Sequence, residues 1–389
     1  MARDSVADII RLYSTSDVRH RRLRADVKRA FGRISVCRTA KLGAHIKRCE
    51  CGHVNSIEYN SCRHRCCPQC QGARKANWLK KISEQLLPCA HTHVIFTVPE
   101  QLNVFWQYNR RLFAEILVKA ARETLTTLLA DPHHMGATPG IISVLHTWGR
   151  NLSIHPHVHC LVTTGGVDDN GTFVTPKRSI LVPNRMLMQV FRGKMRAALI
   201  RSVRRRELQL PPHLTTAKSI SVFNRLSRSD WNTRVLESYT HGASVAGYLA
   251  RYLGGNPISG RRIERHSNRE VVFRYKDHRD GEEKRMCLTP DEFLRRWSEH
   301  VPPKGMRTIR RSGLYANSCS ALRHAVCEQL RSFAPSEARH VDAQLARVSS
   351  LEADRCPLCN TDVVLRHVIR PLSQPMIGKS PAISLTRPP

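Results

Sequence analysis

Apolar residues recur every three or four positions along much of the chain, the spacing that places them on one face of a helix. The first segment follows this spacing at Val6, Ile9, Ile10 and Tyr13. The pattern predicts helices over residues 4–33, 76–87, 101–130, 184–208 and 240–253. Shorter runs rich in β-branched and aromatic residues predict strands at 93–98, 141–148 and 157–164.

Further along the chain, the sequence predicts a β-hairpin followed by the start of a helix. The runs 271–275 and 284–288 flank the turn signal Asp280–Gly281 and predict two paired strands. Thr289 and Pro290 then suit the N-cap and the first position of a helix. Helices and strands alternate without regular βαβ order, so the pattern predicts an α+β fold.

Three segments differ in composition and predict the domain organisation. Residues 1–90 are helical at first and then rich in Cys and His, residues 91–332 carry the mixed helices and strands, and residues 333–389 are sparse in apolar positions. The Pro- and Ser-rich end of the last segment predicts partial disorder.

The net charge of the chain indicates which class of partner it binds. Lys and Arg number 63 against 31 Asp and Glu, a formal net charge of +32. Such an excess favours a bound polyanion, and nucleic acid is the commonest one. No run approaches the roughly 18–20 apolar residues of a membrane helix, and the start of the chain lacks the apolar region of a signal peptide. We therefore expect a cytoplasmic protein with no membrane partner.

Cysteines gather near the N-terminus in a metal-binding pattern. Cys49-x-Cys51 and, after fifteen intervening residues, Cys67-x-x-Cys70 resemble the two knuckles of a zinc ribbon, although the first knuckle is one residue short. Further candidate ligands, for a second site or as substitutes in the first, are His45, Cys62 and Cys66. A run of free thiols is the alternative. A second half-ribbon, Cys356-x-x-Cys359, has no evident partner, although His367 follows it.

Basic side chains surround these candidate zinc ligands. They are Arg63, Arg65, Arg74 and Lys75. Because a polyanion is the expected partner, we predict that this module contacts DNA as well as holding zinc.

The stretch from Ile154 to Val162 carries alternating histidines. On a strand His157 and His159 share one face, about 7 Å apart, while Val158 points to the opposite, core face. Two imidazoles so placed can converge on one cation, and His155 joins them if the strand extends through Pro156. A chance cluster, or a zinc site unconnected with catalysis, is the alternative.

Two tyrosines, Tyr248 and Tyr252, lie four residues apart in a predicted helix and so share a face. A phenol can attack phosphorus and form a phosphotyrosine ester. A helix that packs two aromatic rings on a core explains the same spacing.

Taken together, these motifs resemble the two-tyrosine rolling-circle transposases of bacterial insertion sequences, within the HUH endonuclease superfamily and with an N-terminal transposase zinc-binding domain. The resemblance extends over nearly the whole chain and rests on the segments 59–70, 93–99, 145–149, 155–160, 248–252, 273–277 and 300–305. Cys66 stands where relatives usually carry His, and Gly260 stands where they usually carry Asn.

The resemblance implies a central antiparallel sheet flanked by helices, an HUH nuclease-like domain over residues 91–332. It implies Mg²⁺ or Mn²⁺ on His157 and His159, with Tyr248 and Tyr252 as nucleophiles. For the third metal ligand we expect His155, with His146 in reserve.

The predicted function is a DNA transposase that nicks and rejoins single-stranded DNA through a 5′-phosphotyrosine. We expect its partners to be single-stranded or hairpin element ends in a bacterial nucleoid, with Zn²⁺ as structural cofactor. Arg251, Arg261 and Arg262 complete the predicted DNA contacts. The oligomeric state, homo-oligomer included, stays open. The alternatives are a rolling-circle replication initiator and an inactive zinc-ribbon DNA-binding protein.

Overall fold

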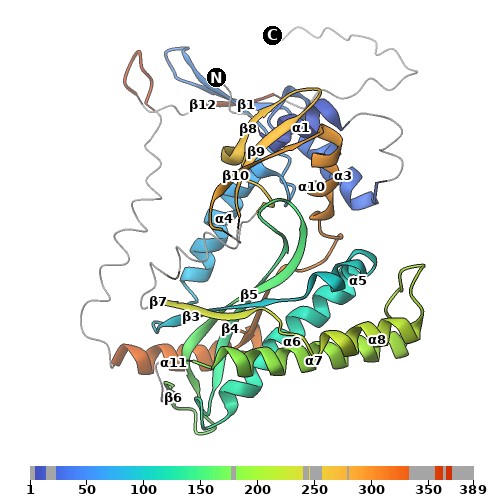
Figure 1. The fold of residues 1–389 in the computed structure, drawn as a ribbon. Coiled ribbons are helices and arrows are strands. Elements are labelled where there is room, and N and C mark those ends of the chain that lie inside the picture. The colour runs from blue at the N-terminus through green and yellow to red at the C-terminus, as the bar shows by residue number, and fades with distance from the viewer. Residues whose placement is uncertain are drawn as a thin grey trace.

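Antiparallel strand pairs organise the protein. The computed structural model describes residues 5–14, 23–176, 181–239, 245, 256–277, 280–332, 355–361 and 365–369. Within these residues the strands form three sheets, all of their pairs antiparallel. Figure 1 shows the largest sheet with its helices in the lower part of the view and the two smaller sheets in the upper part.

The central sheet has six strands, with β4 and β5 in its middle. Its strand order is β11-β4-β5-β3-β7, and the short β6 pairs with β5. The bounds are β3 (His91–Thr97), β4 (Thr138–Trp148), β5 (Ile154–Val167), β6 (Phe173–Val174), β7 (Thr233–Tyr239) and β11 (Ile309–Gly313). Because β4 and β5 form one long hairpin, residues near its turn lie side by side.

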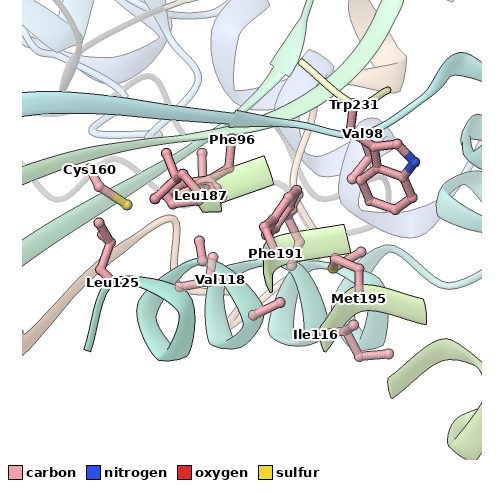
Figure 2. Packing of buried hydrophobic residues seen from close by; sticks show 14 of the residues in the cluster. Phe96, Val98, Ile116, Val118, Leu125, Cys160, Leu187, Phe191, Met195 and Trp231 are labelled. Atoms are coloured by element: carbon pink, nitrogen blue, oxygen red, sulfur yellow. The ribbon is translucent and has the colours of Figure 1, made fainter. Parts of the chain in front are cut away.

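Helices cover one face of this sheet and form a large core with it. They are η2 (Glu100–Leu102), α5 (Asn103–Tyr108), α6 (Arg110–Ala130), α7 (Asn184–Arg204) and α8 (Thr216–Leu226). In this core Phe96 of β3 packs on Phe191 of α7 with ring centroids 4.8 Å apart (Figure 2). Val158 and Cys160 of β5 are fully buried in the same cluster. Burial of one such side chain contributes about 2 kcal/mol to the stability of the fold, so the packing of these helices on the sheet is strongly favourable.

The opposite face of the sheet is covered by α4 (Pro68–Ser83) and α11 (Ser320–Ser332), the latter preceded by η4 (Asn317–Cys319). Ile142 and Leu161 of the sheet, Ile82 of α4 and Val326 of α11 share a second buried cluster there. Alternation along β5 therefore sends Val158 to one face and the histidines beside it to the face under α4.

The N-terminal helices pack with a segment more than 200 residues later. They are α1 (Val6–Tyr13) and α3 (Ala25–Ser35), and the later elements are η3 (Gly260–Arg262), β8 (Ile263–His266), β9 (Val271–Lys276), β10 (Glu283–Leu288) and α10 (Pro290–Glu299). Phe31 of α3 and Trp297 of α10 lie with ring centroids 5.8 Å apart in the shared core. The Thr289 side chain accepts from the Glu292 N–H, which confirms the predicted helix cap.

The third sheet joins the two ends of the chain. β1 (Ala44–Arg48) follows η1 (Ala40–Leu42) and pairs with β2 (Val54–Tyr59) on one side and with β12 (Leu365–Ile369) on the other. Figure 1 shows β12 beside β1 at the top of the view.

The predicted α+β fold with a central antiparallel sheet is confirmed. The helix predicted over 4–33 divides into α1 and α3, with residues 15–22 outside the described chain. The helix predicted to begin at residue 76 begins earlier, at Pro68. Proline is favoured at the first position of a helix, where its missing N–H costs no hydrogen bond. The predicted helix 240–253 lies outside the described residues except for Val245. The domain boundaries predicted near residues 90 and 332 stay a prediction.

Among the described helices, none combines the length and the apolar character that a membrane crossing requires.

Candidate active site and metal centres

Three histidines come together on the face of the sheet under α4. The cross-strand register places His146 of β4 opposite His157 of β5, and His159 lies two residues further along β5. One ligand nitrogen from each lies within 4.8 Å of the others. We call His146, His157 and His159 the histidine triad. Directly opposed strand residues are about 5 Å apart, so pairing of the two strands builds this geometry.

Neighbouring groups orient two members of the triad. The His157 Nδ1 lies 2.6 Å from the His155 carbonyl oxygen and donates to it. The His159 Nδ1 lies 2.9 Å from the His93 Nε2 on β3. Burial and the neighbouring imidazoles lower the pKa of His159, so its ring is neutral at neutral pH. Neutral imidazoles with Nδ1 engaged can present Nε2 to a cation.

His155, the predicted third ligand, lies outside this group. Its side chain is exposed at the start of β5. Together with Tyr275, Lys276 and Asp277 it lines a different cavity. The reserve candidate, His146, completes the triad instead. The sequence spacing along one strand favoured His155, whereas the register between two strands brings His146 nearer.

A cavity of about 300 Å³ adjoins the triad between α4 and β4. Arg74 and Lys75 of α4 line it opposite His146 and Trp148 of β4. The Trp148 ring stacks on His146 with centroids 4.6 Å apart and planes inclined by 23°. A basic wall and an aromatic ring beside a triad of imidazoles suit a nucleotide strand.

Buried donors add to this character of the cavity. Trp106 Nε1, Arg110 Nε and Trp297 Nε1 are buried and have no hydrogen-bond partner among the described residues. All three residues line the same cavity. Buried donors cost free energy unless water or a ligand accepts from them, so the cavity wall favours an acceptor-rich occupant.

Four buried cysteines form what we call the inner thiol cluster: Cys37, Cys62, Cys67 and Cys70. The Cys70 Sγ lies 3.4 Å from the Cys37 Sγ and 3.6 Å from the Cys62 Sγ. Four thiolates about 2.3 Å from a tetrahedral zinc ion are about 3.8 Å apart, so these residues fit zinc. The backbone N–H of His64 points to the Cys62 Sγ at 3.4 Å and stabilises a thiolate there.

A second group, which we call the outer thiol cluster, consists of Cys49, Cys51, Cys356 and Cys359. The structure thus corrects the predicted ribbon, in which the knuckle at Cys49 pairs with the knuckle at Cys67. Pairing of β12 with β1 brings the C-terminal half-ribbon to the first knuckle, and the second knuckle finds Cys37 and Cys62 instead.

Two other candidate zinc ligands belong to neither cluster. His45 lies on β1, opposite Glu58 of β2. Cys66 is half-buried and lines the cavity beside the triad. Among the described residues both are therefore absent from the groups able to hold an ion.

The predicted DNA contacts occupy different settings. Arg63, Arg74 and Arg261 are exposed. Arg65 donates to the carbonyl oxygens of Met306 at 2.7 Å and Pro303 at 3.3 Å, so it also fastens the cysteine segment to the loop before β11. Arg262 donates to the Arg274 carbonyl oxygen at 2.7 Å. Arg251 lies outside the described residues.

Tyr248 and Tyr252 also lie outside the described residues. The described chain resumes at Asn256, which lines the cavity beside the triad. The Gln71 Nε2 of α4 donates to the Asn256 Oδ1 at 2.7 Å. In the sequence, Tyr252 is therefore four residues before Asn256, which lines the cavity.

Sequence reasoning assigned no role to Cys37 or to His93. Cys37 stands twelve residues before the first knuckle, outside any ribbon spacing. His93 lies in a strand motif of its own, and only the pairing of β3 with β5 brings it to His159. Alternation of His91 and His93 in that strand is the one local signal of a shared polar face.

Comparison with known proteins agrees with these features. A family model described as "Putative transposase" matches residues 140–322, and one described as "Transposase zinc-binding domain" matches residues 9–98. "Putative transposase y4qJ" of Sinorhizobium fredii (strain NBRC 101917 / NGR234) is 35% identical over 369 residues, 91% of this chain and 92% of that protein. "Transposase for insertion sequence element IS801" of Pseudomonas savastanoi pv. phaseolicola is 30% identical over 348 residues, 87% of this chain and 82% of that protein. No solved structure matches the chain.

The matches define a transposase with an N-terminal zinc-binding domain, and the inner thiol cluster lies within that domain. The chain belongs to the family of the IS91 and IS801 insertion-sequence transposases.

Proposed function

We propose that this transposase cuts and rejoins single-stranded DNA at the ends of its insertion sequence through a 5′-phosphotyrosine intermediate. The observation that carries the proposal is the histidine triad in the wall of a basic cavity. Three converging imidazoles supply a cation site, and Arg74 and Lys75 supply positive charge where a phosphate backbone would pass.

The donor set bears on which cation binds. Imidazole nitrogens suit transition ions, whereas Mg²⁺ prefers oxygen ligands. Between Mg²⁺ and Mn²⁺, the triad favours Mn²⁺. When bound, the cation polarises the scissile phosphate and offsets the charge of the transition state.

The chain's own residues then carry the chemistry. The phenol oxygen of Tyr248 or Tyr252 attacks phosphorus, the bond to the 3′ oxygen breaks, and that oxygen leaves with a proton as a free 3′-OH. The reverse attack by a 3′-OH releases the tyrosine and rejoins the strand. Each step exchanges one phosphate ester for another, so no nucleotide triphosphate is needed. The position of Asn256 in the cavity wall, close in sequence to Tyr252, supports this assignment.

A covalent adduct is the direct test. A labelled single-stranded oligonucleotide from the element's own terminus is incubated with the full chain and Mn²⁺. We expect a protein–DNA band that survives denaturation, forms only when the cation is present, and maps to Tyr248 or Tyr252 by mass spectrometry. Cleavage that leaves a free 5′-phosphate and no protein-linked product would reject the phosphotyrosine route.

Removal of two charges from the cavity wall is expected to change the salt dependence of binding. With Arg74→Gln and Lys75→Gln, the slope of log affinity against log salt should fall by about 1.4, since each contact to single-stranded DNA contributes about 0.7. Fluorescence anisotropy at several salt concentrations measures this slope. The matched control is Arg201→Gln with Arg204→Gln, two exposed charges on α7 across the sheet. An equal loss in both variants would mean diffuse attraction rather than a path through the cavity.

We also propose that the inner thiol cluster holds a structural zinc ion. The cluster lies in the core shared by α1, α3 and α10, and structural zinc contributes on the order of 10 kcal/mol to folding. Cys62→Ser should therefore remove about one zinc per chain and lower the melting temperature by more than about 10 °C, measured by elemental analysis and calorimetry. Cys287→Ser, an exposed thiol outside both clusters, is the control. Unchanged zinc content in Cys62→Ser would contradict the assignment.

A further inference from the structure

We infer that the outer thiol cluster binds a second zinc ion, which fastens the C-terminal segment to the hairpin of β1 and β2. Its half-sites are 305 to 310 residues apart in sequence. The Cys49 Sγ lies 3.1 Å from the Cys359 Sγ, and the Cys51 Sγ lies 3.7 Å from the Cys356 Sγ. All four sulfur atoms lie within 4.8 Å of one another, as the thiolates of one tetrahedral zinc site do.

The backbone around each half-site forms a tight turn that aims two thiols at one point. In the first, the Gly52 N–H donates to the Cys49 carbonyl oxygen at 2.9 Å, and Gly52 has a φ of 89°, a conformation that glycine adopts freely. In the second, the Asn360 N–H donates to the Cys356 carbonyl oxygen at 2.9 Å. The short first knuckle therefore closes without a second intervening residue.

A hydroxyl group lies between sulfur atoms of the two half-sites. The Thr361 Oγ1 lies 3.2 Å from the Cys49 Sγ and 3.1 Å from the Cys359 Sγ. A hydroxyl between two sulfurs can donate to a thiolate, and such donors stabilise the charge that a metal ligand carries. Thr361 thus supports one half-site from each end of the chain.

Apart from Cys356, the described side chains of this segment are poorly buried. The three hydrophobic clusters contain none of the side chains described at 355–361, 368 and 369. On β12, Val368 is 65% exposed and Ile369 is 45% exposed. Small modules with little core of their own commonly use a metal ion. A metal ion shared by the two half-sites would hold this segment where its described apolar side chains do not.

One half of the site, Cys356 and Cys359, lies outside what the family models cover, since it follows the matched residues 9–98 and 140–322. It does not depend on the proposed chemistry at the triad. Its consequence is that the zinc-binding domain is completed by the far end of the chain.

Zinc stoichiometry tests the inference on the full chain. Wild-type protein, purified under reducing conditions, should hold two zinc ions per chain. Cys356→Ser with Cys359→Ser should hold one, and so should Cys49→Ser with Cys51→Ser. The variant with all four substitutions should still hold one, because both half-sites serve the same ion. Cys287→Ser with Cys319→Ser is the control and should hold two.

Alkylation of the wild-type chain gives a second readout that needs no variant. Cys51, Cys359 and Cys287 are all exposed. With zinc bound, Cys51 and Cys359 should react with iodoacetamide at least tenfold more slowly than Cys287, and a chelator should abolish the difference. Two zinc ions in the Cys356→Ser, Cys359→Ser variant, equal alkylation of all three thiols, or a disulfide between the half-sites in the reduced protein would each overturn the inference.

Discussion

His146→Ala is expected to lower Mn²⁺-dependent DNA nicking by about 10³-fold or more, a loss of about 4 kcal/mol of transition-state stabilisation. His146 supplies one of three imidazoles that lie within 4.8 Å of one another. Two remaining ligands hold a divalent cation weakly, and the phosphate then loses its electrophilic partner. His157→Ala should behave alike. Single-turnover cleavage of a labelled oligonucleotide, with binding measured separately by anisotropy, separates lost chemistry from lost affinity.

The matched control is His155→Ala, which should stay within about threefold of wild type. His155 is exposed and lies outside the triad. The group that accepts from the His157 Nδ1 is its backbone carbonyl, which alanine retains. If His155→Ala lost as much activity as His146→Ala, the third ligand would be the one that strand spacing predicts, and the cation would sit nearer the start of β5.

His93→Ala should have an intermediate effect, because His93 acts through His159. Its Nε2 lies 2.9 Å from the His159 Nδ1. Removal of a residue that orients a metal ligand typically costs ten- to a hundredfold in metal affinity or activity. A rise in the Mn²⁺ concentration needed for half-maximal cleavage, with rescue at high Mn²⁺, would identify a positioning role. A loss that no Mn²⁺ concentration restores would contradict it.

The contrast between His155 and His146 shows what a sequence can predict here. Alternation along one strand is local, so the sequence alone places His157 and His159 on one face and Val158 in the core, where it is fully buried. The partner from β4 depends on which residues of two strands stand opposite each other, and a slip of one residue would turn His146 to the other face. Local pattern therefore predicts two of the three histidines, and register decides the last.

The cysteines show the same limit of prediction from local sequence, here for residues about 300 positions apart. The knuckles at Cys49 and Cys67 are visible because each is a short turn. Which knuckles share an ion depends on the pairing of β1 with β12, at the opposite end of the chain. Apolar spacing predicts α7 and most of the helical segment 101–130, which the structure divides into η2, α5 and α6 with a break at Asn109.

The double variant Tyr248→Phe, Tyr252→Phe should form no covalent DNA adduct, a fall of at least about 10⁴-fold, or about 5.4 kcal/mol. Phenylalanine removes only the phenol oxygen that would attack phosphorus, so DNA binding should stay within twofold of wild type. Tyr108→Phe, at an exposed position on α5, is the matched control and should form adduct normally.

The single variants carry the mechanistic information. If the two tyrosines act in turn, the two single variants should differ on a one-site oligonucleotide. The variant that lacks the first nucleophile should lose the adduct entirely, and the variant that lacks the second should still form one. Both should fail to transfer a strand between two sites, because transfer requires a second phenol while the first is esterified. Full transfer by either single variant would mean that one tyrosine suffices. An undiminished adduct in the double variant would remove both tyrosines from the reaction and leave the histidine triad with a different nucleophile, such as water.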